Sequence, residues 1–236
     1  MMASGLGHQA RKAADEVGTP AHDRIEATLC ATFRGEPLRT DAGQTPQEDC
    51  VAAACASWTG WLGGMFLAAP GRAKRRELAN TGPDTIEGSI WSSDGVAGKI
   101  DCIWPDTDGA RWVLDWKTSS EPDGSLFRRL LPKYRVQVAG YLVDAEERDD
   151  DTMAGGGLVV LPSSAHGGRE LAVEHLWTRE QLEPEIAMQR HYRALFWLRA
   201  DQARARGDAT LAGYDLANLR PTPERYRTRA RVRGWT

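Results

Sequence analysis

Apolar residues recur at helical spacing near the start of the chain. Ile25, Leu29 and Phe33 follow one another every four residues, which gives this segment one apolar face. Thr19 suits the N-cap of a helix, and Pro20 suits the first helical position. The pattern therefore predicts a helix that begins at these two residues.

Polar segments flank this helix on both sides. We expect residues 1–16 to form a flexible or helical lead-in, and the polar composition of 34–48 predicts a loop. A second helix, rich in Ala and Trp, is predicted over about 49–69, because Pro70-Gly71 then ends it. Three strands are predicted next. They lie near 86–91, 96–104 and 110–117, with turns at Asp94-Gly95 and 106–109.

The second half of the chain alternates between helical and strand patterns. The predicted elements are, in order, a loop over 118–132, an amphipathic helix over about 134–147, a break at Gly155-Gly-Gly157, strands at 158–161 and 171–177, and a helix capped by Thr178 that runs to about 206. This order predicts an α/β core with helices on the faces of a sheet.

Length and charge limit what such a core can be. The chain has 236 residues, so we expect one domain over 1–236, with a core over about 16–177, a C-terminal helix over 178–206 and a basic tail over 220–236. The formal net charge is −3, so any attraction for phosphate must be local.

The sequence shows no pattern typical of a membrane span or a signal peptide, which bears on the state of its cysteines. The sequence has no uninterrupted apolar stretch of about 18 residues, which predicts no membrane span. Its first residues lack the apolar run of a signal peptide, so we expect a cytoplasmic protein. The four cysteines, Cys30, Cys50, Cys55 and Cys102, are then expected to be reduced thiols.

Charged residues interrupt two of the predicted strands. Asp115 and Lys117 end the third strand, and Asp101 stands in the second strand fourteen residues before Asp115. Because side chains alternate along a strand, Asp115 and Lys117 should point to the same face. Two carboxylates can hold a hard divalent cation, and the ammonium group can meet a phosphate or the attacking water. The same triplet could also be an ordinary solvent-facing strand end.

Four short motifs follow one another along the chain in an informative order. They are Gly18-x-x-x-His22, Gly98-x-x-Asp101, Asp115-x-Lys117 and Gln137-x-x-x-Tyr141. Together, over about residues 16–162, they resemble the RecB-type nucleases of the PD-(D/E)xK superfamily, especially the compact phage and mobile-element versions. The resemblance implies an α/β, restriction-endonuclease-like core with a mixed central sheet flanked by helices.

The resemblance also implies a metal site. By that match, His22, Asp101, Asp115 and the backbone carbonyl of Trp116 bind Mg²⁺ or Mn²⁺, and Lys117 is catalytic together with the two aspartates. Such a nitrogen and oxygen ligand set suits either ion. Lys117 could stabilise negative charge on the phosphate, or it could orient or deprotonate the attacking water if its pKa is lowered.

Residues outside the ligand set have more than one interpretation. Gln137 and Tyr141 share one helix face and, by the resemblance, contact the DNA strand; otherwise Tyr141 is a core residue and Gln137 a solvated neighbour. By the resemblance, Glu87 stands where such nucleases often carry a glutamate on the first strand. Its role is either to support the metal ligands or structural, so we leave it outside the catalytic set. Glu26 is expected to form a surface salt bridge.

The expected activity is a divalent-metal-dependent exonuclease acting on the ends of linear DNA, single- or double-stranded. Alternatives are a structure-specific endonuclease, or a non-catalytic or partner-dependent DNA-end-binding component of a recombination or repair complex with a separate helicase or other partner. One branch of the family holds an iron–sulfur cluster through one cysteine before the nuclease core and three after it. Here the last cysteine is Cys102, so no cluster is expected.

Two further features bear on DNA binding. The segment 220–236 has six arginines and one glutamate, and it either contacts phosphates or forms a solvated tail. Trp58 and Trp61 are expected in the core, although stacking on a displaced base is the alternative.

Overall fold

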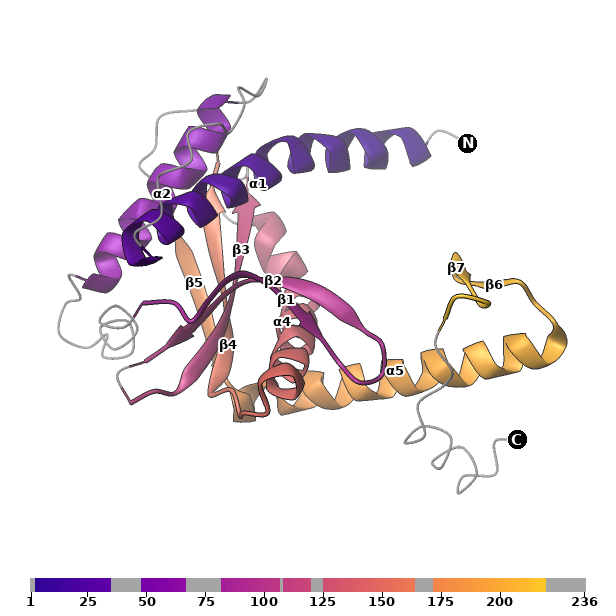
Figure 1. Cartoon of the computed structure of the whole chain (residues 1–236). Helices are drawn as coiled ribbons and strands as arrows, with labels where there is room; N and C mark the ends of the chain where they lie inside the picture. Colours follow the sequence, from indigo (N-terminus) through magenta and orange to yellow (C-terminus); the bar gives the residue numbers. More distant parts are fainter. Residues whose placement is uncertain are drawn as a thin grey trace.

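A mixed five-stranded sheet forms the centre of the molecule (Figure 1). The computed structural model describes residues 3–34, 48–66, 82–106, 108–119, 125–163 and 172–219. The strands, in sheet order, are β1 (Thr85–Trp91), β2 (Ala97–Pro105), β3 (Arg111–Ser119), β4 (Gly155–Pro162) and β5 (Val173–Thr178). β3 and β4 are parallel, whereas the other neighbouring strands are antiparallel.

Helices cover both faces of this sheet (Figure 1). They are α1 (Ala3–Arg34), α2 (Glu48–Phe66), α4 (Ser125–Asp149) and α5 (Arg179–Arg206). α1 and α2 pack with one face of the sheet in a hydrophobic cluster, and α4 and α5 pack with the other face in a second cluster. α4 is the crossover that a parallel pair such as β3 and β4 requires. The α/β class and the helix-covered mixed sheet are therefore as predicted.

The first helix begins much earlier than predicted. α1 starts at Ala3 and contains Pro20 in its interior, so the prediction of a helix start at Thr19 and Pro20 was wrong. A proline inside a helix removes one backbone hydrogen bond. Packing explains why the helix continues, since Val17 and Ala21, on either side of this point, are buried in the cluster with α2 and the sheet.

The helix after β3 also differs from the prediction. α4 starts at Ser125 and includes Pro132, so part of the predicted loop over 118–132 is helical. Leu131 and Tyr134 pack against Leu158 and Val160 of β4. This burial on the sheet outweighs the local cost of the proline.

The three consecutive glycines form a strand and not a break. Gly155, Gly156 and Gly157 begin β4 and pair with β3 on one side and β5 on the other. A Cβ atom on Gly156 would lie 2.3 Å from Val138 Cγ1 of α4. The glycines are needed because α4 and the neighbouring strands approach the backbone closely.

Other predictions are confirmed. The turns before β2 and β3 contain Gly95 and Gly109, both with φ near +81°, where glycine is favoured. Thr178 caps α5 in a capping box with Gln181, and the helix ends at Arg206. A small hairpin, β6 (Thr210–Leu211) and β7 (Tyr214–Asp215), follows α5 and was not predicted. The segments 35–47, 67–81 and 220–236, with the predicted loop and basic tail, lie outside the described residues.

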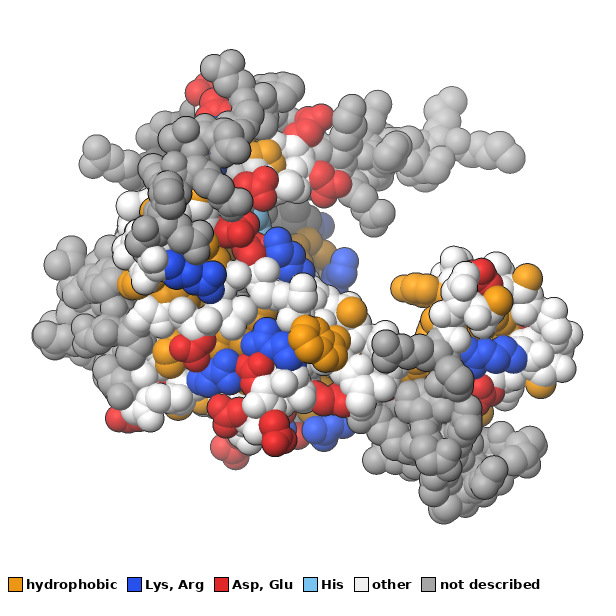
Figure 2. All heavy atoms as spheres, in the orientation of Figure 1, with side chains coloured by type: hydrophobic (Ala, Val, Ile, Leu, Met, Phe, Trp, Pro, Cys, Tyr) orange, Lys and Arg blue, Asp and Glu red, His pale blue; other side chains and the backbone are white. Residues whose placement is uncertain are grey.

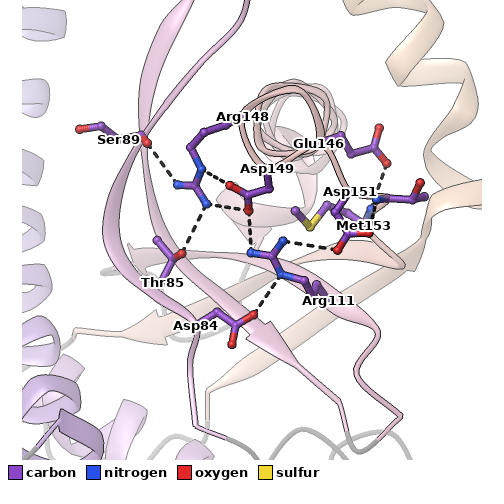
Figure 3. Close-up of polar contacts among 10 residues, drawn as sticks. Asp84, Thr85, Ser89, Arg111, Glu146, Arg148, Asp149, Asp151 and Met153 are labelled. Atoms are coloured by element: carbon purple, nitrogen blue, oxygen red, sulfur yellow. Dashed lines mark hydrogen bonds and ion pairs between the residues drawn. The ribbon is translucent and has the colours of Figure 1, made fainter.

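A cluster of ion pairs joins the end of α4 to the sheet (Figure 3). Arg111 of β3 pairs with Asp149 of α4 at 2.6 Å and with Asp84 before β1 at 3.0 Å. Arg148 also pairs with Asp149 and donates a hydrogen bond to the Ser89 carbonyl at 3.2 Å. These contacts fix α4 against β1 and β3, and α4 also carries Gln137 and Tyr141.

Candidate functional site

The site lies where β2 and β3 part from each other. Their ladder runs from Pro105 with Arg111 to Cys102 with Leu114, and both strands continue beyond it. Asp101 and Asp115 are the next residues on each strand. The Trp116 N–H donates to Asp101 Oδ2 at 2.5 Å, so a side-chain oxygen accepts the hydrogen bond that a ladder partner would otherwise accept. The two aspartates therefore flank the end of the β2–β3 ladder, which we call the gap between these strands.

The Trp116 carbonyl faces the same gap. In an antiparallel strand the N–H and C=O of one residue point to the same edge, as the paired exchange of hydrogen bonds requires. Because the Trp116 N–H points to Asp101 of β2, its carbonyl is directed toward β2 as well. This orientation is compatible with the metal-ligand role that we assigned to the carbonyl from the sequence.

Three side chains from three elements converge at the gap. His22 of α1 has its Nδ1 3.3 Å from Asp101 Oδ1 and 3.8 Å from Glu87 Oε1 of β1. Ligand atoms of these three residues all lie within 4.8 Å of one another. Histidine nitrogen and carboxylate oxygen are ligands that suit Mn²⁺ and, for the oxygens, Mg²⁺.

Glu87 is the site residue that our sequence analysis left out. The β1–β2 register pairs Ile86 with Cys102 and Gly88 with Ile100, so Glu87 stands opposite Asp101. Its backbone has φ +49°, a left-handed conformation that is uncommon for a non-glycine residue. Its Oε2 also lies 2.6 Å from Lys99 Nζ. An acidic residue opposite Asp101 in the predicted hairpin was the available signal.

Asp115 and Lys117 form an ion pair beside this group. Lys117 Nζ lies 2.6 Å from Asp115 Oδ2, and the Asp115 side chain is buried. Burial, and then the negative charge of Asp101, raise the pKa of Asp115 to about 7, although Lys117 opposes the shift. Two carboxylates therefore lie close together in a poorly solvated place, an arrangement that a cation would stabilise. This observation fits the implied divalent metal.

Neighbouring carboxylates raise the pKa values of the two nitrogen bases at the site. Burial disfavours the His22 imidazolium, but the hydrogen bond and charge of Asp101 outweigh it and raise the pKa of His22. Burial likewise opposes the Lys117 ammonium, but Asp115 and Asp101 raise the pKa of Lys117. Without a metal, Lys117 thus lacks the lowered pKa that a role as proton acceptor needs.

Gln137 and Tyr141 lie at the same place on α4. Gln137 Nε2 donates to Tyr141 Oη at 2.7 Å. Burial raises the pKa of Tyr141 against the opposing Gln137 hydrogen bond, and the charge of Asp115 adds to the increase. Both residues are half-buried, and Tyr141 also packs against the hydrophobic cluster between the sheet, α4 and α5, as the alternative of a core tyrosine expects.

The tryptophans around the site are packing residues, as expected. The rings of Trp58 and Trp61 meet the Trp116 ring edge-on, with centroids 6.4 Å and 5.4 Å away. The Trp61 indole N–H also donates to Glu174 Oε2 at 3.0 Å. These contacts pack α2 against β3, and both rings are buried in the core.

The comparisons with known proteins identify no relative. No protein-family model matches the chain, and a search of curated proteins found no match. No helix in the described part of the chain is long and apolar enough to cross a membrane.

Proposed function

We propose that this chain is a divalent-metal-dependent deoxyribonuclease with a RecB-type, restriction-endonuclease-like core. The observation that carries the proposal is the gap between β2 and β3. There, His22, Glu87 and Asp101 come together from α1, β1 and β2, next to the ion pair between the buried Asp115 and the half-buried Lys117. These groups come from a helix, a hairpin and a separate strand. Charged residues that merely face solvent at one strand end would not converge in this way.

His22, Asp101, Asp115 and the Trp116 carbonyl would hold the metal, and we add Glu87 to this set. Bound there, Mg²⁺ or Mn²⁺ would lower the pKa of a water molecule and offset negative charge on the phosphate. The two aspartates are buried and therefore kept apart from bulk water. Charge interactions are stronger in such an environment than in water.

Lys117 has the role of stabilising charge on the phosphate. Its ammonium is held by Asp115 at 2.6 Å, on the same face of β3, which fixes where it points. A fixed cation at the place where negative charge develops lowers the barrier without reorganising. Gln137 and Tyr141 are positioned beside it on α4 to contact the DNA strand.

The favoured mode is exonuclease action on linear DNA, because the motif resemblance implies it. The test is digestion of end-labelled linear DNA, single- and double-stranded, alongside closed circular DNA, in Mg²⁺, Mn²⁺ and EDTA. Lys117→Ala is the catalytic control, and it should retain metal binding. Glu180→Gln, on the exposed first turn of α5, is the matched surface control and should keep the wild-type rate.

Each outcome of this digestion has a defined meaning. Loss of linear DNA alone, dependent on metal and on Lys117, supports the exonuclease and gives its polarity. Nicking of circles means an endonuclease with the same site. Wild-type cleavage by Lys117→Ala contradicts the assignment of that residue. DNA binding without cleavage favours a binding module, or an enzyme that needs a separate helicase or recombination partner.

A further inference from the structure

A groove lies at the turn of the β1–β2 hairpin, whose strands carry Glu87 and Asp101. It is bounded by the turn of this hairpin, by α5 and by the β6–β7 hairpin (Figure 1). Two adjoining hollows form it, of about 410 Å³ and 300 Å³, and both are lined by Val96, Ala97, Trp197 and Leu219. On the face shown in Figure 2, hydrophobic side chains lie on both sides of the space between the main body and the β6–β7 hairpin.

Exposed aromatic side chains gather along this groove. Trp91 of β1, Tyr192 of α5 and Tyr214 of β7 are 56%, 55% and 57% exposed, and all three line it. The Phe196 ring contacts the Tyr214 ring edge-on, with ring centroids 5.8 Å apart. Aromatic side chains this exposed are not part of a hydrophobic core. They are suited to stacking on planar ligands.

The described lining of the groove has almost no charge of its own. No acidic residue lines either hollow in the described part of the chain, and the one charged lining residue, Arg193, is paired with Asp144 at 2.7 Å and lies 3.7 Å from Asp94. Leu219 lines both hollows, and the segment that starts at the next residue, 220–236, carries six arginines and one glutamate. The sequence that directly follows the groove residue Leu219 is therefore strongly basic, and this composition favours an anionic ligand.

The groove and the candidate metal site are connected through two elements, β2 and α4. Ala97 and Asp101 stand on the same strand, about 13 Å apart at about 3.3 Å per residue. A Cβ atom on Gly98, next to Ala97, would lie 3.4 Å from the Tyr141 ring. Gln189 of the groove donates to the Val136 carbonyl at 2.8 Å, immediately before Gln137. The residues that we expect to contact DNA at the site therefore border the groove.

We propose that this groove binds single-stranded DNA a few nucleotides from the bond that is cut, with bases stacked on Trp91, Tyr192 and Tyr214. The inference rests on the proposed function, which is the reason for choosing DNA as the ligand. A duplex hides the faces of its bases in its own stack, whereas a single strand exposes them to aromatic side chains. The groove thereby selects single strands, or duplex ends that have been opened.

The test is fluorescence anisotropy with a labelled 20-nucleotide oligo(dT) and a blunt 20-base-pair duplex, in EDTA so that cleavage does not enter. Tyr192→Ala should weaken binding of the single strand by about 5- to 150-fold, because stacking contributes about 1–3 kcal/mol per base. Tyr192→Phe keeps the ring and should bind as the wild type does. Binding of the duplex should change little in either variant.

Two further variants make the result specific. Met188→Ala removes another exposed apolar side chain of α5, 39% exposed and one turn before Tyr192, but outside the groove. It should leave oligo(dT) affinity unchanged. Tyr214→Ala, on a different element, should repeat the loss seen with Tyr192→Ala. Thermal unfolding of each variant confirms that the fold is retained.

The outcomes separate this inference from the proposed function. Equal oligo(dT) affinity in wild type, Tyr192→Ala and Tyr214→Ala overturns the groove proposal, even if the enzyme cuts DNA in Mn²⁺, and the groove then belongs to another partner such as a peptide. Selective loss of oligo(dT) binding supports the groove even if no cleavage is ever observed, in which case only the nuclease proposal fails.

Discussion

Glu87 combines an unfavourable backbone conformation with a charged side chain at the candidate site. Left-handed φ angles cost a non-glycine residue about 1–3 kcal/mol and persist where the surroundings enforce them. Here the conformation directs the carboxylate toward His22, 3.8 Å away, in the same group as Asp101. Asp150, with φ +51°, has the same backbone conformation at an exposed position after α4.

These two residues give a matched pair of variants. Glu87→Gly removes the carboxylate but suits the backbone, so we expect Mn²⁺ affinity to fall by at least about tenfold without loss of stability. Asp150→Gly relieves the same conformation outside the site and should leave Mn²⁺ affinity unchanged. Isothermal titration calorimetry measures both. An unchanged affinity in Glu87→Gly would remove this residue from the metal site.

The candidate site was partly predictable because charged residues interrupt apolar strands. Asp101, Asp115 and Lys117 stand out for that reason, and His22 follows from its place in the first motif. Glu87 was noted but left outside the site, since its place among the ligands depends on the β1–β2 register and on a backbone angle that no local pattern records. The Gln137–Tyr141 hydrogen bond does follow from their spacing on a helix.

At the scale of elements, tertiary packing overrides local preference in three places. Pro20 and Pro132 lie inside helices, and the glycines at 155–157 lie inside a strand. Each is a residue that normally ends an element. In each case the neighbouring element supplies contacts that the local sequence does not reveal. The alternating strands and the Thr178 cap were predictable because their signals are local.

Two glycine variants test this account of packing. Gly156→Ala places a Cβ atom 2.3 Å from Val138 Cγ1, so we expect a loss of about 1–3 kcal/mol in the free energy of unfolding. Gly18→Ala, inside α1, would meet only Thr118 Oγ1 at 3.6 Å and should gain up to about 1 kcal/mol. Urea unfolding measures both. Equal stability of Gly156→Ala and wild type would contradict the close approach of α4 to β4.

At the scale of the whole molecule, ion pairs connect parts of the chain that are far apart in sequence. Asp149 of α4 meets Arg111 of β3, which also reaches Asp84 before β1 (Figure 3). The hydrogen bond from Arg148, and then that from Arg111, lower the pKa of Asp149 against the opposing effect of burial. Such long-range pairing could not be predicted, because it depends on the finished arrangement of helix and sheet.

The lowered pKa predicts how stability depends on pH. A carboxylate whose pKa falls on folding stabilises the fold above its ordinary pKa, and this contribution is lost as the pH falls through the folded value. Asp149→Asn should therefore lower the free energy of unfolding at pH 7 by about 1.5–3 kcal/mol. Its difference from wild type should shrink below about pH 4.

Thermal unfolding between pH 3 and pH 7, at about one-unit steps, measures this difference. Asp150→Asn, at the exposed neighbouring position, is the control and should unfold as the wild type does. A difference between Asp149→Asn and wild type that stays constant across this range would show that the ion pairs of Figure 3 contribute nothing through charge.

The most direct test of the metal-dependent nuclease is to measure bound Mn²⁺ and DNA cleavage in the same titration. The account predicts that cleavage of linear DNA rises with bound Mn²⁺ in the wild type. Asp101→Asn should lose both, and Lys117→Ala should lose cleavage while it still binds Mn²⁺. Cleavage that persists in EDTA, or wild-type Mn²⁺ binding by Asp101→Asn, would contradict the central claim.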